Sequence, residues 1–213
     1  MKVTLQGIPL ELLPQRMLYI PDYHMLCLAD WHLGKAAHFR KSGIPVPQPN
    51  LEKEFQSVKH LVEKRKIRRV LFLGDLFHSS SNNDWKLFDD FIRGLPEVSF
   101  TLVKGNHDII ERTGFEQIGV EMVDEIVLDD RILLTHEPLH LKTPPGVLNV
   151  AGHIHPGYRL ALRARQVVLL PCFHYSCSTL TLPAFGNLTG LHPVGHNEQD
   201  EYYCILGDEV VRI

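Results

Sequence analysis

Residues 69–78 of the chain, RVLFLGDLFH, place a glycine and an aspartate directly behind a short apolar run. Such a run, bounded by charge and glycine, predicts a buried strand, because strands of parallel sheets are apolar on both faces. Asp75 then stands at the carboxyl end of that strand. Four further runs also end at polar residues: Met25–Ala29, Val98–Val103, Ile132–Thr135 and Val147–Ala151. The sequence therefore predicts strands whose carboxyl ends carry polar chemistry.

Two helical patterns connect the first three runs in chain order. Apolar residues recur at helical spacing over residues 51–62, behind the good N-cap Asn50, and again over residues 83–93. Strand, helix, strand, helix, strand predicts a right-handed parallel βαβαβ unit. Residues 33–50, which contain three prolines, are expected to form one long irregular connection.

The second half of the chain has a different pattern of predicted elements. Beyond Gly119, closely spaced β segments turn at Asp129-Asp130 and at Gly207-Asp208, which predicts hairpins. We therefore expect an α/β fold of two sheets with flanking helices. Since no repeat, low-complexity tract or shift in composition marks a boundary, residues 1–213 are expected to form a single domain.

The composition excludes several classes of protein. With 213 residues, 44% apolar and 22% charged, the chain is an ordinary globular protein. Its four cysteines form no Cys-x-x-Cys pair, so neither a zinc knuckle nor a disulfide lattice is expected, and a reducing cytoplasm is favoured. No apolar stretch approaches the roughly 20 residues that span a bilayer, and Met1–Ile20 lacks a signal-peptide pattern. The net charge of −3 offers no overall attraction to nucleic acid, whereas 13 histidines point toward a metal site.

The polar residues at the strand ends form one chemical set. In open α/β sheets, ligands bind beyond the carboxyl ends of the strands. This edge would gather two aspartates, four histidines and an asparagine: Asp30, Asp75, His32, His136, His153, His155 and Asn106. Oxygen and nitrogen donors without thiolate suit Mn²⁺, Fe or Zn²⁺. Seven donors exceed the need of one ion but suit two octahedral ions that share a carboxylate, the arrangement that promotes phosphoryl transfer.

The ordered motifs resemble the calcineurin-like metallophosphoesterase superfamily over residues 25–155. They are Asp30-x-His32, Gly74-Asp75, Gly105-Asn106-His107-Asp108, His136 and Gly152-His153-x-His155. The resemblance implies a four-layer sandwich of two mixed β-sheets flanked by helices. It also implies that Asp30, His32 and His155 hold one ion, that Asn106, His136 and His153 hold the other, and that Asp75 bridges both. His107 would act on the substrate as a general acid, oriented by Asp108.

Further motifs resemble the bacterial DNA-ligase-associated metallophosphoesterases. These are Asp30-Trp31-His32-Leu33-Gly34-Lys35, Gly43-Ile44-Pro45-Val46-Pro47, Gly74-Asp75-Leu76-Phe77-His78 and Leu182-Pro183-Ala184-Phe185-Gly186. This likeness implies a manganese-dependent phosphodiesterase or endonuclease in DNA repair, with an ATP-dependent ligase and a helicase as genomic neighbours. Two positions depart from the expected pattern: Trp31, whose bulky ring could alter the pocket rim, and Leu191, where a glycine is expected.

Most of the remaining histidines and basic residues are interpreted as structural or solvent-exposed residues. A histidine near an apolar strand is more often a hydrogen-bonded structural residue than a ligand, an interpretation applied to His24, His60, His140, His174, His192 and His196. The roles of His38 and His78 stay open. Residues 64–69 are read as a solvated helix end, whereas Lys35, Arg40 and Lys41 are better candidates for flanking phosphates. Cys172 and Cys177 are expected to be small buried hydrophobes.

The leading hypothesis is a dinuclear metal-dependent phosphoesterase. A metal-bridging hydroxide would attack phosphorus in line, and His107 would assist the departing alkoxide. The resemblance favours a phosphodiester in DNA or RNA, handled in the cytoplasm without a membrane. A small-molecule phosphodiesterase or phosphomonoesterase is the alternative. A non-catalytic interaction scaffold of the same fold is less favoured, because the whole ligand set is present.

Overall fold

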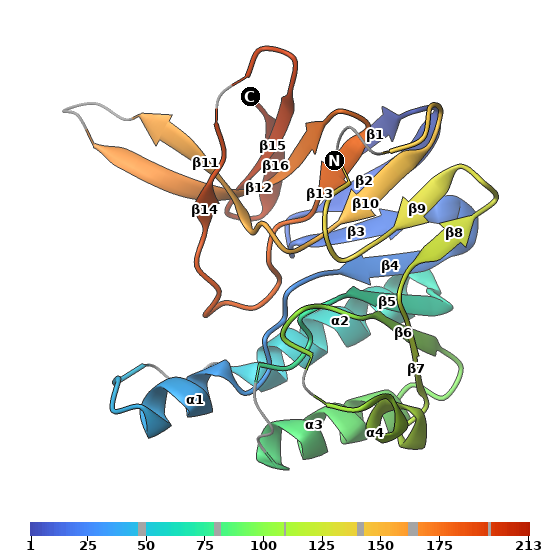
Figure 1. Ribbon diagram of the computed structural model, residues 1–213, viewed down its shortest axis with the longest axis vertical. Helices are drawn as coiled ribbons and strands as arrows, with labels where there is room; N and C mark the ends of the chain where they lie inside the picture. The colour runs from blue at the N-terminus through green and yellow to red at the C-terminus, as the bar shows by residue number, and fades with distance from the viewer. Residues whose placement is uncertain (47–49, 79–81, 109, 140–142, 162–165, 196) are drawn as a thin grey trace.

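A computed structural model describes residues 1–46, 50–78, 82–108, 110–139, 143–161, 166–195 and 197–213 (Figure 1). Its first β-sheet follows chain order from β1 to β7. Neighbouring strands are antiparallel up to β4 and parallel from β4 to β7. The strands are β1 (Lys2–Leu5), β2 (Ile8–Leu13), β3 (Met17–Ile20), β4 (Met25–Leu28), β5 (Arg69–Leu73), β6 (Ser99–Val103) and β7 (Val120–Val123).

The second sheet is also mixed, with the order β14-β11-β12-β13-β10-β9-β8, and β15 joins β12 to β16. Its strands are β8 (Ile126–Leu128), β9 (Ile132–Leu134), β10 (Leu148–Ala151), β11 (Pro156–Ala161), β12 (Val167–Ser176), β13 (Thr179–Thr181), β14 (His192–Pro193), β15 (Glu201–Leu206) and β16 (Glu209–Arg212). The hairpin turns expected at residues 129–130 and 207–208 connect β8 to β9 and β15 to β16. The predicted class, two mixed β-sheets with helices, is confirmed.

The described residues form four α-helices and one 3₁₀ helix. They are η1 (Pro21–Tyr23), α1 (Lys35–Lys41), α2 (Leu51–Arg65), α3 (Asn82–Arg93) and α4 (Arg112–Gln117). Figure 1 shows α2, α3 and α4 against the face of the first sheet that is turned away from the second sheet. The side chain of Asn50 accepts a hydrogen bond from Lys53 N at 3.1 Å, as its predicted capping role requires. Residues 33–50 are not wholly irregular, because α1 occupies part of them.

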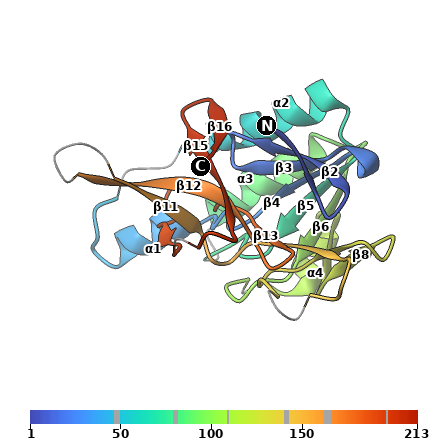
Figure 2. The same ribbon diagram turned by 90° about the horizontal axis from the view of Figure 1, so that it is seen from above.

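Alternate residues of the inner strands face different cores. In β4, Leu26 and Leu28 pack in the core beneath the helices, whereas Met25 and Cys27 pack in the core between the sheets. Both faces are therefore buried, which explains the continuous apolar runs of the sequence. Both views in Figures 1 and 2 place α1 and the projecting β11–β12 hairpin on the same side, beyond the strand ends that carry the polar residues.

The ring of Trp31 is buried in the helical core, which corrects the expectation that it could shape the rim of a pocket. Its side chain is buried among Phe55, Phe72, Phe88, Phe91 and Phe185. The indole Nε1 donates to Glu54 Oε2 at 2.7 Å, and Glu54 Oε1 accepts from Asn187 Nδ2 at 2.7 Å. This buried carboxylate of α2 therefore anchors the turn that carries Asp30 and His32.

Two other sequence predictions meet different outcomes. Cys172 is buried as predicted, but Cys177 is exposed, because it lies in the tight turn between β12 and β13. Within the described residues, no helix combines the length and the apolar character needed to cross a bilayer.

Candidate metal centre

Backbone pairing continues beyond the ends of β4 and β5. Asp30 N donates to Gly74 O at 3.2 Å, His32 N to Asp75 O at 2.9 Å, and Leu33 N to Leu76 O at 2.8 Å. The loops behind the two strands consequently run side by side. Asp30 and His32 are thereby held next to Asp75, although more than 40 residues separate them in the chain.

Direct hydrogen bonds join the two sheets at this edge. His153 N, behind β10, donates to Asp30 Oδ2 at 2.9 Å. His136, behind β9, places its ring Nδ1 2.9 Å from Leu73 O, where Nδ1 is the donor. In a neutral ring, a proton on Nδ1 leaves Nε2 with the lone pair that a metal ligand presents to the site. The second sheet thus delivers its histidines in a defined orientation.

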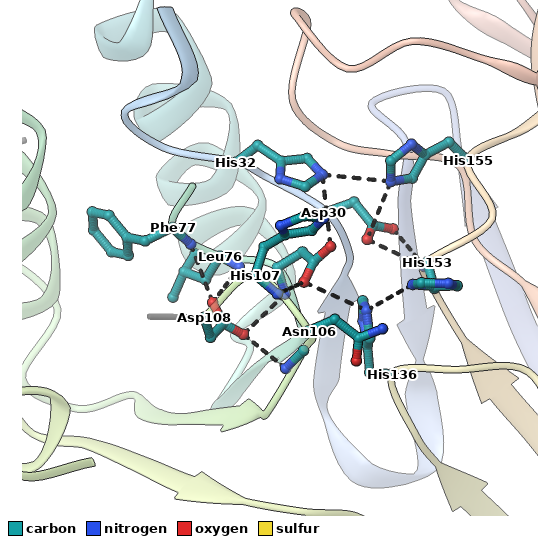
Figure 3. A network of polar contacts seen from close by, with 12 residues as sticks. Asp30, His32, Leu76, Phe77, Asn106, His107, Asp108, His136, His153 and His155 are labelled. Atoms are coloured by element: carbon teal, nitrogen blue, oxygen red, sulfur yellow. Dashed lines mark hydrogen bonds and ion pairs between the residues drawn. The ribbon is translucent and has the colours of Figure 1, made fainter. Parts of the chain in front are cut away.

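Asp30, His32 and His155 form a first group of donor atoms (Figure 3). His155 Nε2 lies 3.4 Å from Asp30 Oδ1 and 3.5 Å from His32 Nε2. Two ligands of one ion, each at about 2.1 Å from it, are about 3 Å apart when adjacent, so this spacing fits a divalent cation.

Asp75, His136 and His153 form the second group. His136 Nε2 lies 3.1 Å from His153 Nδ1 and 3.5 Å from Asp75 Oδ1. The other carboxylate oxygen, Asp75 Oδ2, is 3.9 Å from His32 Nε2 of the first group. Asp75 therefore lies between the two groups, with one oxygen turned to each.

The backbone at this edge is strained. Positive φ angles of 50–70° occur at Asp30, His32, Asp75, His153 and His155, all of them candidate ligands. Non-glycine residues rarely adopt this conformation, and it costs on the order of 1 kcal/mol per residue. Strain of this kind persists where the surrounding contacts dictate it and is concentrated at functional sites.

The motif glycines are required because atoms of other loops approach them closely, as well as because the chain turns there. A Cβ on Gly74, whose φ is +79°, would lie 2.1 Å from His136 Nδ1. A Cβ on Gly152 would lie 2.7 Å from Asp30 Oδ2. Any side chain at either position would push the sheets apart where the ligands meet.

The charge balance of the site fits bound cations. Asp30 and Asp75 are 0% and 2% exposed. Burial, together with the charge of Lys35, lowers the pKa of His32 to about 2, so its imidazole is neutral. Two buried carboxylates beside a neutral imidazole call for more positive charge than the half-buried Lys35 alone provides. Two divalent ions would supply it, and the set of carboxylates and imidazoles suits them.

Asn106 and Glu137 lie beside the second group. Asn106 Nδ2 donates to Glu137 Oε1 at 2.8 Å. This bond, followed by the charges of His153 and His136, lowers the pKa of Glu137. Sequence reasoning missed Glu137, and the signal available for it was only its position directly after His136.

His107 has an exposed imidazole beside the first group. Its ring centre is 5.9 Å from that of His32 and 5.2 Å from that of His78. His78 in turn lies 5.2 Å from His38 of α1. Burial, followed by the charge of Lys35, lowers the pKa of His78. The half-buried Lys35 and three accessible histidines thus border the predicted ligands on the side of α1.

Asp108 corrects a second expectation, that it orients the ring of His107. Its carboxylate instead accepts from four backbone amides: those of Asp75, Leu76, Phe77 and Gly105, at 2.8 to 3.2 Å. The side chain is 8% exposed, and burial raises its pKa against the lowering effect of these amides. Asp108 therefore ties the loop behind β6 to the loop that presents Asp75.

Replacing Asp108 with alanine is expected to destabilise the metal-free protein by about 3 kcal/mol or more, because buried amides lose their acceptor. Asp108→Asn keeps one acceptor oxygen and is expected to cost less. Urea unfolding in the presence of a chelator measures both variants. Unchanged stability with reduced turnover would instead assign Asp108 to the orientation of His107.

Of the histidines interpreted as structural, His174 has a hydrogen-bonded ring, whereas His24, His60 and His192 are exposed. His174 Nε2 lies 3.0 Å from Asp200 Oδ2, and its ring stacks on Tyr202. His24 ends the 3₁₀ helix with a left-handed backbone. His140 and His196 lie outside the described residues. In the described parts of the chain, the two groups above are the only clusters of three or more such side chains with metal-ligand spacing.

Comparison with known proteins adds two findings. The family model described as calcineurin-like phosphoesterase matches residues 23–160. Among solved structures, the Pseudomonas putida nuclease MPE is 24% identical, with a TM-score of 0.80 over 100% of this chain and 99% of that one. The Escherichia coli phosphoesterase Yfce and an archaeal phosphodiesterase align more loosely, each at 14% identity over 89% of this chain, with TM-scores of 0.42 and 0.43 and coverage of 97% and 98% of their own chains.

Proposed function

The chain belongs to the calcineurin-like phosphoesterase family, a class of phosphoric ester hydrolases, and we propose that it is a two-metal phosphodiesterase that cuts nucleic acid. The observation that carries this proposal is the position of Asp75, whose two carboxylate oxygens face two separate groups of donor atoms. Residues 1–213 are proposed to act as one catalytic domain.

The proposed ligands are divided between two sites. Asp30, His32 and His155 would hold one divalent ion, Asn106, His136 and His153 the other, and Asp75 would serve both. When bound, two such ions polarise the phosphoryl group and make water a strong nucleophile for in-line attack. Manganese is the proposed metal because the chain resembles the DNA-ligase-associated enzymes, for which manganese is implied. The donors themselves, oxygen and imidazole nitrogen without thiolate, suit Mn²⁺, Fe and Zn²⁺ alike.

The chain's own residues would serve the substrate around these ligands. His107 is exposed beside the first group and can donate a proton to the departing oxygen. Lys35 adds positive charge near Asp30 and Asp75. Arg40 and Lys41 lie further along α1, where they could meet phosphates that flank the scissile one. A nuclease shares this fold over the whole chain, which makes nucleic acid the first substrate to test.

Metal removal and reconstitution test the proposal. Chelator-treated protein is expected to lose turnover and to regain it with Mn²⁺, at a stoichiometry of two ions per chain. The reconstituted protein is then offered single-stranded DNA, RNA, cyclic nucleotides and a phosphomonoester in parallel. We expect cleavage of the polynucleotides. Exclusive hydrolysis of cyclic nucleotides or of the monoester would indicate a small-molecule enzyme, and failure to bind metal would indicate a scaffold.

We further propose a cytoplasmic role in DNA repair, with a functional link to an ATP-dependent DNA ligase and a helicase. The support is the resemblance of residues 30–35, 43–47, 74–78 and 182–186 to the DNA-ligase-associated enzymes. Cells that lack the protein are expected to become sensitive to DNA damage. Complementation by the native chain but not by a metal-ligand variant would support this role, and equal complementation by both would oppose it.

A further inference from the structure

Asn106 differs from the other proposed ligands in one respect. Its terminal amide has an oxygen that can bind a cation and a nitrogen that cannot, and the two differ only by rotation of the amide. Its side chain is exposed, so packing alone does not decide the orientation. Correct presentation of the oxygen therefore needs a hydrogen-bond partner.

Glu137 is such a partner. Its Oε1 lies 2.8 Å from Asn106 Nδ2. An ionised carboxylate only accepts hydrogen bonds, so it selects the NH₂ group of the amide. Asn106 Oδ1 then points away from Glu137. Figure 3 shows Asn106 beside His136, a member of the second group.

A partly buried network holds the backbone of Glu137 in place. Its carbonyl oxygen accepts from Thr135 Oγ1 at 2.7 Å, and Thr135 Oγ1 accepts from Asn149 Nδ2 at 2.9 Å. Asn149 lies in β10 and is 0% exposed. Its Nδ2 also donates to Leu133 O at 3.0 Å, and its Oδ1 accepts from Leu139 N at 2.9 Å. The network thus fixes the backbone of Glu137, and the exposed carboxylate of the same residue reaches Asn106 in a loop of the first sheet.

We propose that Glu137 is a positioning residue that orients the Asn106 amide, so that Oδ1 faces the second donor group and sets the affinity of that site for its cation. The inference rests on the proposed function, because it takes Asn106 as a ligand. Glu137 acts through Asn106 and not as a ligand itself. Partners of metal ligands typically change metal affinity by about 10–100-fold when they are removed.

A double-mutant cycle tests this role, with Mn²⁺ binding followed by calorimetry and by metal analysis. Glu137→Ala is expected to weaken the binding of one of the two ions by about 10–100-fold and to leave the binding of the other unchanged. Glu137→Gln, which keeps an acceptor oxygen, is expected to restore part of the affinity. In an Asn106→Ala background, Glu137→Ala is expected to have no further effect, because the group that it orients is gone.

Glu116→Ala, on the exposed face of α4, controls for the loss of one negative charge. The melting temperature of each metal-free variant checks that it is folded. If Glu137→Ala and the native protein bind Mn²⁺ with equal affinity, the inference is overturned but the proposed function is not. A full additional loss in the Asn106→Ala background would do the same, since Glu137 would then bind the cation or act by charge. Native protein that binds fewer than two ions would overturn both the inference and the proposed function.

Discussion

Asp75→Asn is expected to lower the turnover of every phosphodiester substrate by about 10³-fold or more, equivalent to several kcal/mol of lost stabilisation. Asparagine has nearly the same shape but offers one neutral oxygen in place of two charged ones. Since Asp75 Oδ1 and Oδ2 face different donor groups, neither group keeps its full charge. Metal analysis of the purified variant is expected to show less than two ions per chain.

Asp208→Asn, at the exposed turn between β15 and β16, is the matched control and is expected to behave as the native protein. The Asp75 variant is expected to remain folded in chelator, because removing one buried charge from an empty acidic site relieves repulsion. Native turnover with two bound ions in Asp75→Asn would contradict the shared-carboxylate arrangement.

His107→Ala is expected to lower turnover by an amount that depends on the leaving group of the substrate. A deoxyribose alkoxide is strongly basic and needs a proton as it departs, so cleavage of single-stranded DNA should fall by about 10²–10⁴-fold. A p-nitrophenolate is stable without a proton, so hydrolysis of bis(p-nitrophenyl) phosphate should fall much less. Metal content should not change, because the ring of His107 lies outside both donor groups.

His60→Ala, on the exposed surface of α2, controls for the loss of a histidine far from the strand ends. Steady-state kinetics at matched metal loading gives the ratio of variant to native turnover for each of the two substrates. An equal loss on DNA and on the p-nitrophenyl ester would show that His107 acts in binding and not as the general acid.

The sequence identified the inner strands because their signals are local. The predicted run Arg69–Leu73 is the observed β5, and Val98–Val103 differs from β6 by one residue. Apolar residues on both faces of a strand and glycine at its end mark a short segment without reference to distant parts of the chain. The same holds for α2, whose start is set by Asn50.

The sequence failed where a side chain's role depends on its surroundings. Trp31 follows a metal-ligand motif, and only the packing of α2 and α3 shows that its ring belongs to a core. Asp108 follows His107 directly, yet its carboxylate turns to the backbone of a loop about 30 residues away. Helix α1 is seven residues long and lies in a segment with a loop-like composition.

By itself, the sequence determined which donors are available and that each stands at the end of a strand, since alternation, glycine and residue type are properties of adjacent positions. Only the tertiary structure decided that each donor group takes residues from both sheets, with Asp30 and His32 meeting His155, and Asp75 meeting His136 and His153. It also decided the rotamers, the left-handed backbone and the orientation of the Asn106 amide. These depend on contacts between segments distant in the chain, which form only when the two sheets pack together.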